Sequence, residues 1–299
     1  MMGILLIDKA PGWTSHDVVA KLRGLLRERK IGHAGTLDPM ATGLLTVFVG
    51  KATRAVSFAE AANKTYIARV QFGTETDTQD STGRVIATSD IGITREDVIA
   101  SLPQFRGELT QVPPMYSAVQ VNGERLYKLA RRGVEVERNA RPITIFCLEL
   151  LPDSENLAAR EFELEITCSK GTYIRTLCHD MGQSFGCGGM MTALRRTHVG
   201  AFSVDDAMTI AELTSMPEAA SRAKCLRPLD SLFAEHPILT LTPAEEHKFR
   251  NGQAVCMEAA VPERYRVYSQ GGEFLAFAEI AVRQGKAILV SKKNFFMNA

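Results

Sequence analysis

A short carboxylate stands in the middle of a run that is poorly suited to a regular helix or strand. The run is His33-Ala34-Gly35-Thr36-Leu37-Asp38-Pro39-Met40-Ala41-Thr42-Gly43. Gly35 and Gly43 permit backbone dihedrals that other residues avoid, and Pro39 biases Asp38 toward an extended backbone. We therefore expect residues 32–43 to lack regular structure and to hold Asp38 on a rigid turn. These residues alone leave a purely structural Asp-Pro turn open as the alternative.

Regular elements are predicted on both sides of this loop. The apolar runs Ile4–Ile7 and Leu44–Val49 are typical of short buried strands. Between them, Ser15 suits the N-cap of a helix whose apolar residues recur every three or four positions. That apolar face comprises Val18, Val19, Leu22, Leu25 and Leu26. The loop thus joins a helix to a strand.

Further along the chain, alternating apolar residues predict strands at Tyr66–Phe72 and Phe162–Thr167. A second helix is expected from about Tyr173 to Phe185. Residues 115–145 are polar, basic and rich in tyrosine, which favours an excursion from the core that meets a charged partner; a solvated helix and loop is the alternative. Residues 236–299 change to short strand-like pieces and predict a small β domain.

Composition restricts the possible partners. The 299 residues carry 35 Lys and Arg against 34 acids, so any nucleic-acid surface must be local. No apolar run approaches the roughly 20 residues of a membrane helix, and Met1–Ile7 is too short for a secretory signal. We expect a cytoplasmic protein that makes no membrane contact. Because the six cysteines form no C-x-x-C pair, reduced thiols are expected rather than disulfides or a zinc site.

Two further motifs carry candidate site residues. Lys64-Thr65-Tyr66 begins a strand, where Tyr66 could stack on a base or sit in the core. Cys168-Ser169-Lys170-Gly171-Thr172-Tyr173-Ile174-Arg175-Thr176-Leu177 spans a change from strand to helix. If Arg175 reaches Asp38, we expect it to bind both carboxylate oxygens and to lower the pKa of that carboxyl. An ordinary surface arginine is the alternative.

Together these motifs resemble the TruB-type tRNA pseudouridine synthases. The run from His33 to Gly43 matches that family's H-x-G-T-L-D-P-x-A-T-G motif, and the Lys64 and Lys170–Arg175 motifs follow in the family's order. Gly73-Thr74-Glu75-Thr76-Asp77-Thr78 nearly matches a further motif, and similarity continues from Pro113 to Ile145. One departure is Lys9-Ala10-Pro11-Gly12, where the family usually has Lys-Pro-x-Gly. The resemblance covers about residues 3–235.

The resemblance implies isomerisation of the T-loop uridine, position 55 of tRNA, to pseudouridine by a stand-alone enzyme without metal, redox cofactor or guide RNA. It implies that Asp38 is the catalytic carboxylate, and base flipping is expected because a nucleotide inside a folded loop cannot be reached in place. The remaining implied roles are pairing with Asp38 by Arg175, base stacking by Tyr66, pocket lining by Tyr173 and Leu194, entry into the vacated RNA space by His33, loop support by Asp77, and phosphate contact or buttressing by Lys9 and Lys64.

The resemblance also implies the architecture. We expect an α+β pseudouridine synthase fold with a mostly antiparallel mixed central sheet. Residues 1–235 would form the catalytic domain with a thumb-like insertion at about 115–145, and residues 236–299 would form a PUA-like RNA-binding module. The protein would act on the tRNA T stem-loop as a monomer.

The sequence also bears on three other functions. A non-catalytic RNA-binding protein would need the basic surfaces but would have no use for a rigid aspartate with an arginine partner. A guide-dependent, dyskerin-like enzyme shares the Asp38 motif, but the thumb-like stretch favours the stand-alone form. Gly50-Lys51-Ala52-Thr53 resembles the end of a P-loop, yet position 45 is leucine and no Ser or Thr directly follows Lys51. A nucleotide hydrolase is therefore excluded.

Overall fold

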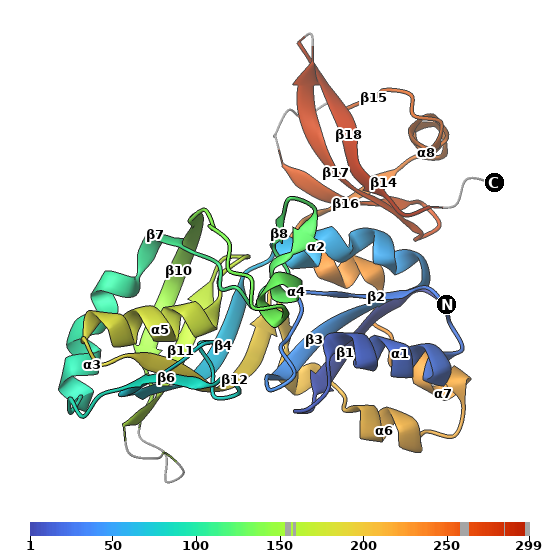
Figure 1. Ribbon diagram of the computed structural model, residues 1–299. Helices are drawn as coiled ribbons and strands as arrows, with labels where there is room; N and C mark the ends of the chain where they lie inside the picture. Colours follow the sequence, from blue (N-terminus) through green and yellow to red (C-terminus); the bar gives the residue numbers. More distant parts are fainter. Residues whose placement is uncertain (153–156, 158–159, 258–262, 284, 297–299) are drawn as a thin grey trace.

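The computed structural model describes residues 1–152, 157, 160–257, 263–283 and 285–296. It has a large body built on one mixed sheet and a smaller β module carried at one side (Figure 1). The α-helices are α1 (Ser15–Leu26), α2 (Val56–Ala61), α3 (Arg95–Ser101), α4 (Leu126–Arg131), α5 (Ile174–Ser184), α6 (Ile210–Ser215), α7 (Ala219–Ala223) and α8 (Pro243–Arg250). The 3₁₀ helices are η1 (Gly50–Ala55), η2 (Leu102–Phe105), η3 (Val204–Asp206) and η4 (Leu229–Phe233).

The central sheet runs in the order β1-β3-β12-β4-β11-β10-β7, with β2 paired to β3 and β13 paired to β12. Its strands are β1 (Gly3–Lys9), β2 (Ile31–Ala34), β3 (Thr42–Val49), β4 (Lys64–Phe72), β7 (Gly107–Gln111), β10 (Arg141–Leu150), β11 (Glu161–Cys168), β12 (Gly189–Val199) and β13 (Phe202–Ser203). The pairs are antiparallel except β12 with β3, which is parallel. The expected mostly antiparallel mixed sheet is confirmed.

Strand and helix positions follow the apolar pattern of the sequence. Buried and half-buried residues alternate along β4 and β11, as in a sheet with one face on the core. The helix α5 packs over β12 and β4 on one side of the sheet, while α1 covers the β1–β3 end (Figure 1). The loop that carries Asp38 lies between these two halves of the body, where β3 meets β12.

Two local predictions need correction. Thr14, not Ser15, caps α1: its side chain accepts a hydrogen bond from the amide of Asp17, and the Asp17 carboxylate accepts one from the Thr14 amide. Residues 32–43 are also less irregular than expected, because Gly32 and His33 pair with Phe48 and Val47 across β2 and β3. Backbone pairing with a strong neighbouring strand overrides the weak strand propensity of this segment. The irregular part is residues 35–41.

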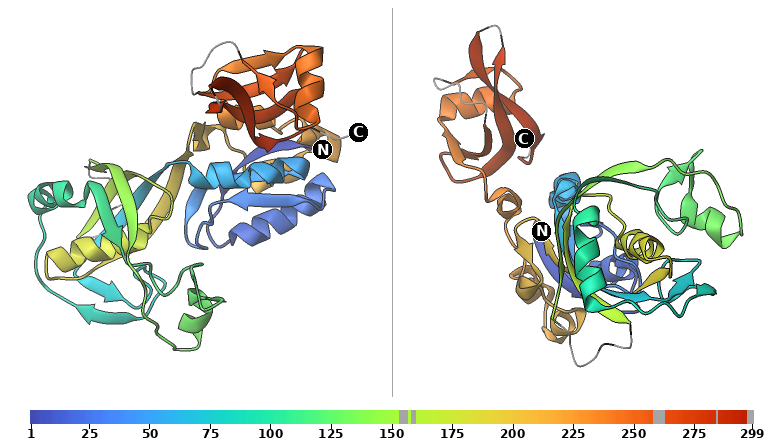
Figure 2. Two further views of the ribbon diagram at one scale, coloured as in Figure 1. Left: turned by 90° about the horizontal axis from the view of Figure 1, so that it is seen from above. Right: turned by 90° about the vertical axis from the view of Figure 1, so that its left-hand side faces the viewer.

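The segment from residue 112 to 140, which connects β7 to β10, projects away from the sheet (Figure 2). It holds the short ribbon of β8 (Gln120–Val121) and β9 (Glu124–Arg125), followed by α4. We call residues 112–140 the thumb. The excursion expected at 115–145 is present but ends earlier, because β10 begins at Arg141 and rejoins the sheet beside β7. Another ribbon, β5 (Thr74–Thr76) with β6 (Val85–Thr88), lies beside the sheet near β12.

The C-terminal part is a second sheet in the order β14-β16-β17-β18-β15, with α8 beside it. Its strands are β14 (Ile238–Leu241), β15 (Val255–Cys256), β16 (Arg264–Ser269), β17 (Phe274–Arg283) and β18 (Lys286–Asn294). Phe277 stacks on Phe233 of η4, with ring centroids 4.3 Å apart, and both belong to an apolar cluster that includes Phe48 of β3. The module is therefore joined to the large body through a shared core. The expected C-terminal β module is confirmed.

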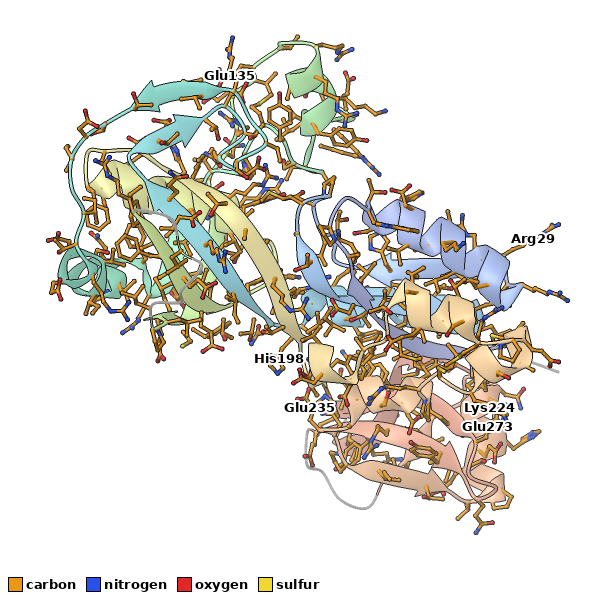
Figure 3. The ribbon with its side chains drawn as sticks, turned by 90° about the horizontal axis from the view of Figure 1, so that it is seen from below. Arg29, Glu135, His198, Lys224, Glu235 and Glu273 are labelled. Atoms are coloured by element: carbon orange, nitrogen blue, oxygen red, sulfur yellow. The ribbon has the colours of Figure 1, made fainter. Side chains whose placement is uncertain are left out.

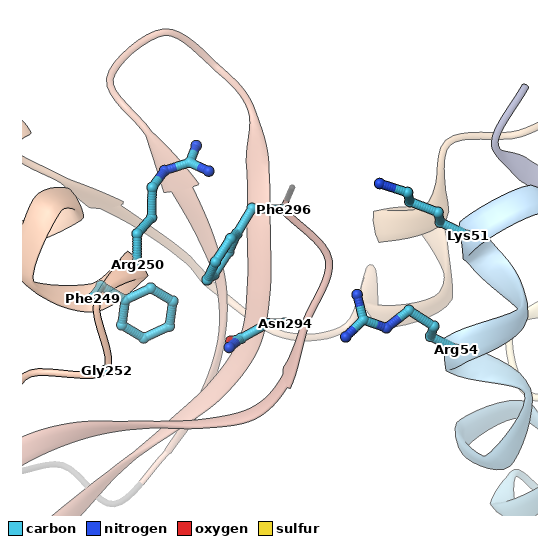
Figure 4. A pocket seen from close by; sticks show the side chains of 7 residues that line it. All are labelled: Lys51, Arg54, Phe249, Arg250, Gly252, Asn294 and Phe296. Carbon is cyan, nitrogen blue, oxygen red and sulfur yellow. The ribbon is translucent and has the colours of Figure 1, made fainter. Parts of the chain in front are cut away.

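A pocket of about 360 Å³ lies between the two parts of the molecule. Lys51 and Arg54 extend from η1 toward Asn294 and Phe296 of the C-terminal module (Figure 4). Arg250, on the opposite wall, already pairs with Glu246 and Glu273. This pocket shares no lining residue with the Asp38 loop.

Basic residues at the end of α1 face solvent. Arg29 projects from the protein surface beyond the last turn of the helix (Figure 3). Across the described ranges, no helix is both long and apolar enough to cross a membrane.

Candidate active site

The loop from residue 35 to 41 is fixed to its surroundings on both sides of Asp38. The hydroxyl of Ser15 accepts a hydrogen bond from the Leu37 amide at 2.9 Å and donates to the Leu37 carbonyl at 3.2 Å. The carbonyl of Pro39 accepts from the Gly12 amide at 2.8 Å and from Lys9 Nζ at 3.3 Å. The backbone on each side of Asp38 is thus held by residues of β1, α1 and the turn between them. This is the rigid turn that the sequence predicts.

Arg175, in the first turn of α5, meets Asp38 from the other side. Its Nε lies 3.0 Å from Oδ2 of Asp38, and its side chain is only 6 % exposed. The pairing is confirmed, but the expected bidentate geometry is wrong. Nη1 and Nη2 donate instead to the carbonyls of Thr78 and Tyr116, at 3.0 and 2.8 Å. Arg175 therefore ties together the Asp38 loop, the turn after β5 and the base of the thumb.

A second carboxylate stands behind this arginine. Oδ2 of Asp80 lies 3.6 Å from Nη1 of Arg175, and Asp80 is buried. Its Oδ1 accepts hydrogen bonds from the hydroxyls of Thr78 and Thr82 and from the Thr82 amide. A buried carboxylate needs such partners, because an unpaired charge is costly to desolvate. Asp80 thereby holds Arg175 in the orientation that reaches Asp38.

The pKa of Asp38 is raised above its ordinary value of 3.8, chiefly because the carboxyl is partly removed from water. The charge of Arg175 and, more weakly, that of Lys9 oppose this rise, whereas the negative charge of Asp80 adds to it. Arg175 lowers this pKa as expected, but burial outweighs its effect and the net shift is upward. Desolvation outweighs one ion pair when the arginine divides its charge between two carboxylates.

An apolar wall adjoins the Asp38 loop. Tyr66 of β4 and Leu194 of β12 are each 9 % exposed, and both pack in one cluster with Leu37 and Ile174. Burial raises the pKa of the Tyr66 hydroxyl, so it remains a neutral phenol at physiological pH. Tyr66 and Leu194 thus stand on neighbouring strands beside the loop.

Tyr173 is fixed by its backbone rather than by its ring. Its amide donates to Oε1 of Gln111 at 2.8 Å, and its carbonyl accepts from Nε2 of the same side chain at 3.0 Å. Gln111 is buried at the end of β7, where the thumb begins. The half-exposed side chain of Tyr173 therefore sits directly before α5, at the entrance to the helix that supplies Arg175.

Comparison with known proteins identifies the family. Residues 23–174 match the N-terminal domain of the TruB family pseudouridylate synthases, and residues 175–234 match a tRNA pseudouridylate synthase B C-terminal domain. The first match alone spans half of the chain. This chain belongs to the TruB family. Members of this family isomerise uridine to pseudouridine. The Asp38 loop lies within the match to the N-terminal pseudouridylate synthase domain.

Curated relatives extend over nearly the full length. A tRNA pseudouridine synthase B of Dechloromonas aromatica is 43 % identical over 90 % of this chain and 88 % of its own. The protein of the same name from Syntrophomonas wolfei is 44 % identical over 93 % of each chain. That of Chromobacterium violaceum is 45 % identical over 90 % of this chain and 87 % of its own. The relatedness thus covers both parts of the molecule.

Solved structures share the fold. A Cbf5-Nop10-Gar1 complex contains a chain that superposes with a TM-score of 0.72 at 23 % identity, covering 98 % of this chain and 85 % of the other. An H/ACA RNP bound to a substrate RNA that contains 2′-deoxyuridine gives a TM-score of 0.71 at 21 % identity, over 99 % and 85 % of the two chains. At this identity the likeness concerns the fold alone.

The two lysines expected at this TruB site are buried. Lys9 is 0 % exposed, and its Nζ donates to the carbonyls of Ala10, Trp13 and Pro39. Lys64 is buried at the head of β4, with Nζ bonded to carbonyls at the end of α2. Burial lowers the pKa of each lysine to about 8. Their position favours buttressing over the alternative of phosphate contact.

The structure does not place Asp77 in the site. Its side chain is exposed, and Oδ1 accepts a hydrogen bond from the Arg84 amide within its own turn. The aspartate beside Arg175 is Asp80, three positions later. His33 lies on β2, half-buried, and burial lowers its pKa, which favours the neutral imidazole. Its Nδ1 is buried and has no hydrogen-bond partner among the described residues.

Four residues of the site are not predicted from the sequence: Ser15, Asp80, Gln111 and Arg196, whose Nη2 donates to the Gly35 carbonyl at 3.0 Å. Asp80 has a local signal, since threonines at positions 78 and 82 flank a short carboxylate that can bond both. Arg196 also has one, because Arg195-Arg196 interrupts a strand in which successive residues face opposite sides, so one arginine must face inward. Gln111 and Ser15 act through contacts distant in sequence and carry no such signal. In the described parts of the chain, no cluster of His, Cys, Asp and Glu could hold a metal ion.

Proposed function

We propose that this protein converts the T-loop uridine of tRNA, position 55, to pseudouridine, with Asp38 as the catalytic carboxylate. The observation that carries the proposal is the contact between Asp38 and Arg175 on a loop that is held from both sides. A rigid, partly desolvated carboxylate beside an apolar wall suits a reaction at the sugar of a bound nucleoside. The curated relatives named tRNA pseudouridine synthase B support tRNA as the substrate.

The chemistry needs a carboxylate. In the isomerisation, the N1–C1′ bond breaks, the uracil turns, and a C5–C1′ bond forms. The proton on C5 then leaves, and N1 takes up a proton. Breaking the glycosidic bond builds positive charge on the sugar, which an ionised Asp38 stabilises or traps covalently. Arg175 keeps Oδ2 of this carboxylate in place throughout. The net reaction balances without an oxidant, reductant or metal, and we propose that none is used.

The surrounding residues would receive an extruded base. Tyr66 would stack on the uracil and stand near C5 for proton transfer, while Leu194 and Tyr173 would enclose it. Extruding a nucleotide from a folded loop costs a few kcal/mol. We propose that His33 offsets this cost by entering the vacated space in the RNA, which a neutral imidazole can do by stacking.

RNA recognition would come from local surfaces. The thumb carries Arg125, Lys128, Arg131, Arg132 and Arg138, and its base is bonded to Arg175 through the Tyr116 carbonyl. We propose that the thumb closes over an RNA loop whose target base reaches Asp38. We propose the thumb for the T loop and the C-terminal module, residues 236–299, for a further part of the RNA, with residues 1–235 as the catalytic domain.

We further propose that the enzyme acts alone, as a cytoplasmic monomer without a guide RNA. The relatives over 40 % identical carry the name of a tRNA enzyme, whereas the guide-RNP structures share 23 % identity or less and support only the fold. A substrate recognised by shape and single-stranded bases needs no guide.

The test is direct. The purified protein is incubated with an unmodified T-arm stem-loop, and pseudouridine is mapped by carbodiimide-dependent stops in primer extension. A stop at the T-loop uridine is expected with RNA and protein alone, and none with a stem-loop that carries cytidine at that position. Folded protein that binds the stem-loop without producing a stop would favour a non-catalytic RNA-binding protein instead.

A further inference from the structure

Arg196 of β12 is the largest fully buried side chain in the described chain, with an exposure of 1 %. No carboxylate of the described residues forms an ion pair with it. A guanidinium buried in this way is costly unless its donors are well used. We therefore ask which groups its donors bind beside the Asp38 loop.

The donors of Arg196 reach both ends of that loop. Nε donates to the carbonyl of Leu44 at 2.7 Å, and Nη2 donates to the carbonyl of Gly35 at 3.0 Å. Gly35 opens the irregular segment that carries Asp38, and Leu44 lies just beyond its end, in β3. One planar side chain thus fixes the distance between the two stems of the loop.

The same residue lies beside Tyr66. In the central sheet β12 runs between β3 and β4, and Arg196 is the cross-strand partner of Gly43 on one side and of Tyr66 on the other. The charge of Arg196 lowers the pKa of the Tyr66 hydroxyl and so opposes the larger rise that burial produces. The guanidinium therefore connects the loop of the carboxylate with the residue proposed to stack on the base.

The close approach of residue 196 also explains two glycines of the Asp38 motif, Gly35 and Gly43. A Cβ at Gly35 would lie 3.1 Å from Nη1 of Arg196, and a Cβ at Gly43 would collide with the Arg196 backbone. Both glycines adopt a positive φ, +73° and +95°, which other residues rarely take. Atoms of Arg196, more than 150 positions away in the chain, thus leave little room for a side chain at these two positions of the motif.

We propose that Arg196 is a positioning residue for the isomerisation, which clamps the two stems of the Asp38 loop and aligns this loop with Tyr66. The inference rests on the proposed function, because it concerns the same reaction. It requires the two-pronged shape of arginine. Lysine would keep the charge but would offer a single nitrogen and could not span both carbonyls in a fixed geometry.

Its neighbour provides a matched control. Arg195 stands next on the same strand but faces the other side of the sheet, where Nη1 and Nη2 bind the carboxylate of Asp8 at 3.0 and 2.8 Å.

The experiment compares Arg196→Lys with Arg195→Lys for thermal unfolding, stem-loop affinity and single-turnover rate at saturating RNA. Misplacing catalytic groups by about 1 Å costs about 10²-fold in rate. We expect such a loss for Arg196→Lys, with affinity within about threefold of wild type, and a rate within about threefold for Arg195→Lys.

A double-mutant cycle separates positioning from general weakening of the fold. If Arg196 acts partly through Tyr66, the Arg196→Lys loss shrinks in a Tyr66→Phe background, because part of the alignment is already gone. Equal rate losses for the two arginine variants, a wild-type rate for Arg196→Lys, or strictly additive losses in the cycle would overturn the inference. Wild-type protein assayed in parallel distinguishes this failure from that of the proposed function, which would leave wild type itself inactive.

A glycine pair keeps the test decisive if Arg196→Lys does not fold. Gly35→Ala pushes a methyl group against the clamp, whereas Gly186→Ala introduces similar strain, at φ +69°, with no atom within 4 Å. We expect Gly35→Ala to be slower than Gly186→Ala by at least about tenfold when both are saturated with RNA. Similar rates for these two variants would contradict the clamp.

Discussion

Oδ2 of Asp80 lies 3.6 Å from Nη1 of Arg175, so the guanidinium that contacts Asp38 also faces a second, buried carboxylate. Two aspartates therefore share one arginine at this site. The arrangement fixes Arg175 in space and at the same time weakens its hold on the charge of Asp38. The pH dependence of the reaction follows from this balance.

If Asp38 acts in its ionised form, as proposed, the isomerisation rate should fall as pH drops through the pKa of Asp38. Because burial raises that pKa above 3.8, the acid limb of the pH–rate profile should lie at higher pH than for a solvated aspartate. Asp80→Asn removes a like charge that raises the pKa of Asp38, so it should move the limb to lower pH. Single-turnover rates from acidic to neutral pH measure both shifts. An acid limb that stays in place in Asp80→Asn would contradict the coupling.

Replacement of Asp38 separates activity from stability. Asp38→Asn should reduce the isomerisation rate by at least about 10³-fold, as loss of a central catalytic group does, while stem-loop affinity stays within a few fold. A raised pKa means that the folded protein disfavours the ionised carboxylate, so at neutral pH the neutral amide should not lower Tm. Thermal unfolding tests the expected stability of Asp38→Asn, and single-turnover assays test its expected loss of rate.

Asp77→Asn is the matched control for this change. Asp77 lies on an exposed turn and accepts one hydrogen bond, from the Arg84 amide, which an asparagine side chain can also accept. It should keep a rate within about threefold of wild type, as surface substitutions usually do. If Asp77→Asn were as slow as Asp38→Asn, the assignment of the catalytic carboxylate would be wrong.

Periodicity predicts strands β1, β3, β4 and β11 of the central sheet and helix α5, and the family resemblance implies the contact of Arg175 with Asp38. Each of these rests on local pattern or on one motif following another. Strands β2, β7, β10, β12 and β13 are not predicted from the sequence. What the sequence could not supply is the environment of each charge. Desolvation of Asp38 depends on what packs around it, and the burial of Lys9 and Lys64 depends on carbonyls brought in by other segments. Both pKa directions and atomic partners therefore needed the structure.

The same limit explains the individual errors. Asp77 and Asp80 stand three residues apart in one polar turn, and only the path of that turn decides which carboxylate meets Arg175. Thr14 and Ser15 are both good caps, and the choice between them depends on Leu37, which draws the Ser15 hydroxyl inward. Where two neighbouring residues have similar chemistry, tertiary contacts decide which of them takes a given role.

Lys64 should make stability depend on pH in the alkaline range. Its pKa is about 8 in the folded protein and 10.5 without burial, so between these values the unfolded chain binds the extra proton. The free energy of unfolding therefore rises with pH across this window, by up to about 1.4 kcal/mol per pH unit per lysine. Lys64→Met should make the slope shallower, as measured by denaturant unfolding at several alkaline pH values. An unchanged slope would show that Lys64 stays charged in the fold.

Ser15 and Thr14 allow loop support to be separated from helix capping. Ser15→Ala leaves the buried amide and carbonyl of Leu37 without their partner, at a cost of about 1–3 kcal/mol. Thr14→Ala removes the cap of α1, at a cost of about 1 kcal/mol. Both variants should therefore unfold at lower temperature. Only Ser15→Ala frees the residue before Asp38, so it should also lose about tenfold or more in single-turnover rate with RNA affinity unchanged. Comparable rates for the two folded variants would mean that the Asp38 turn keeps its geometry without the Ser15 hydroxyl.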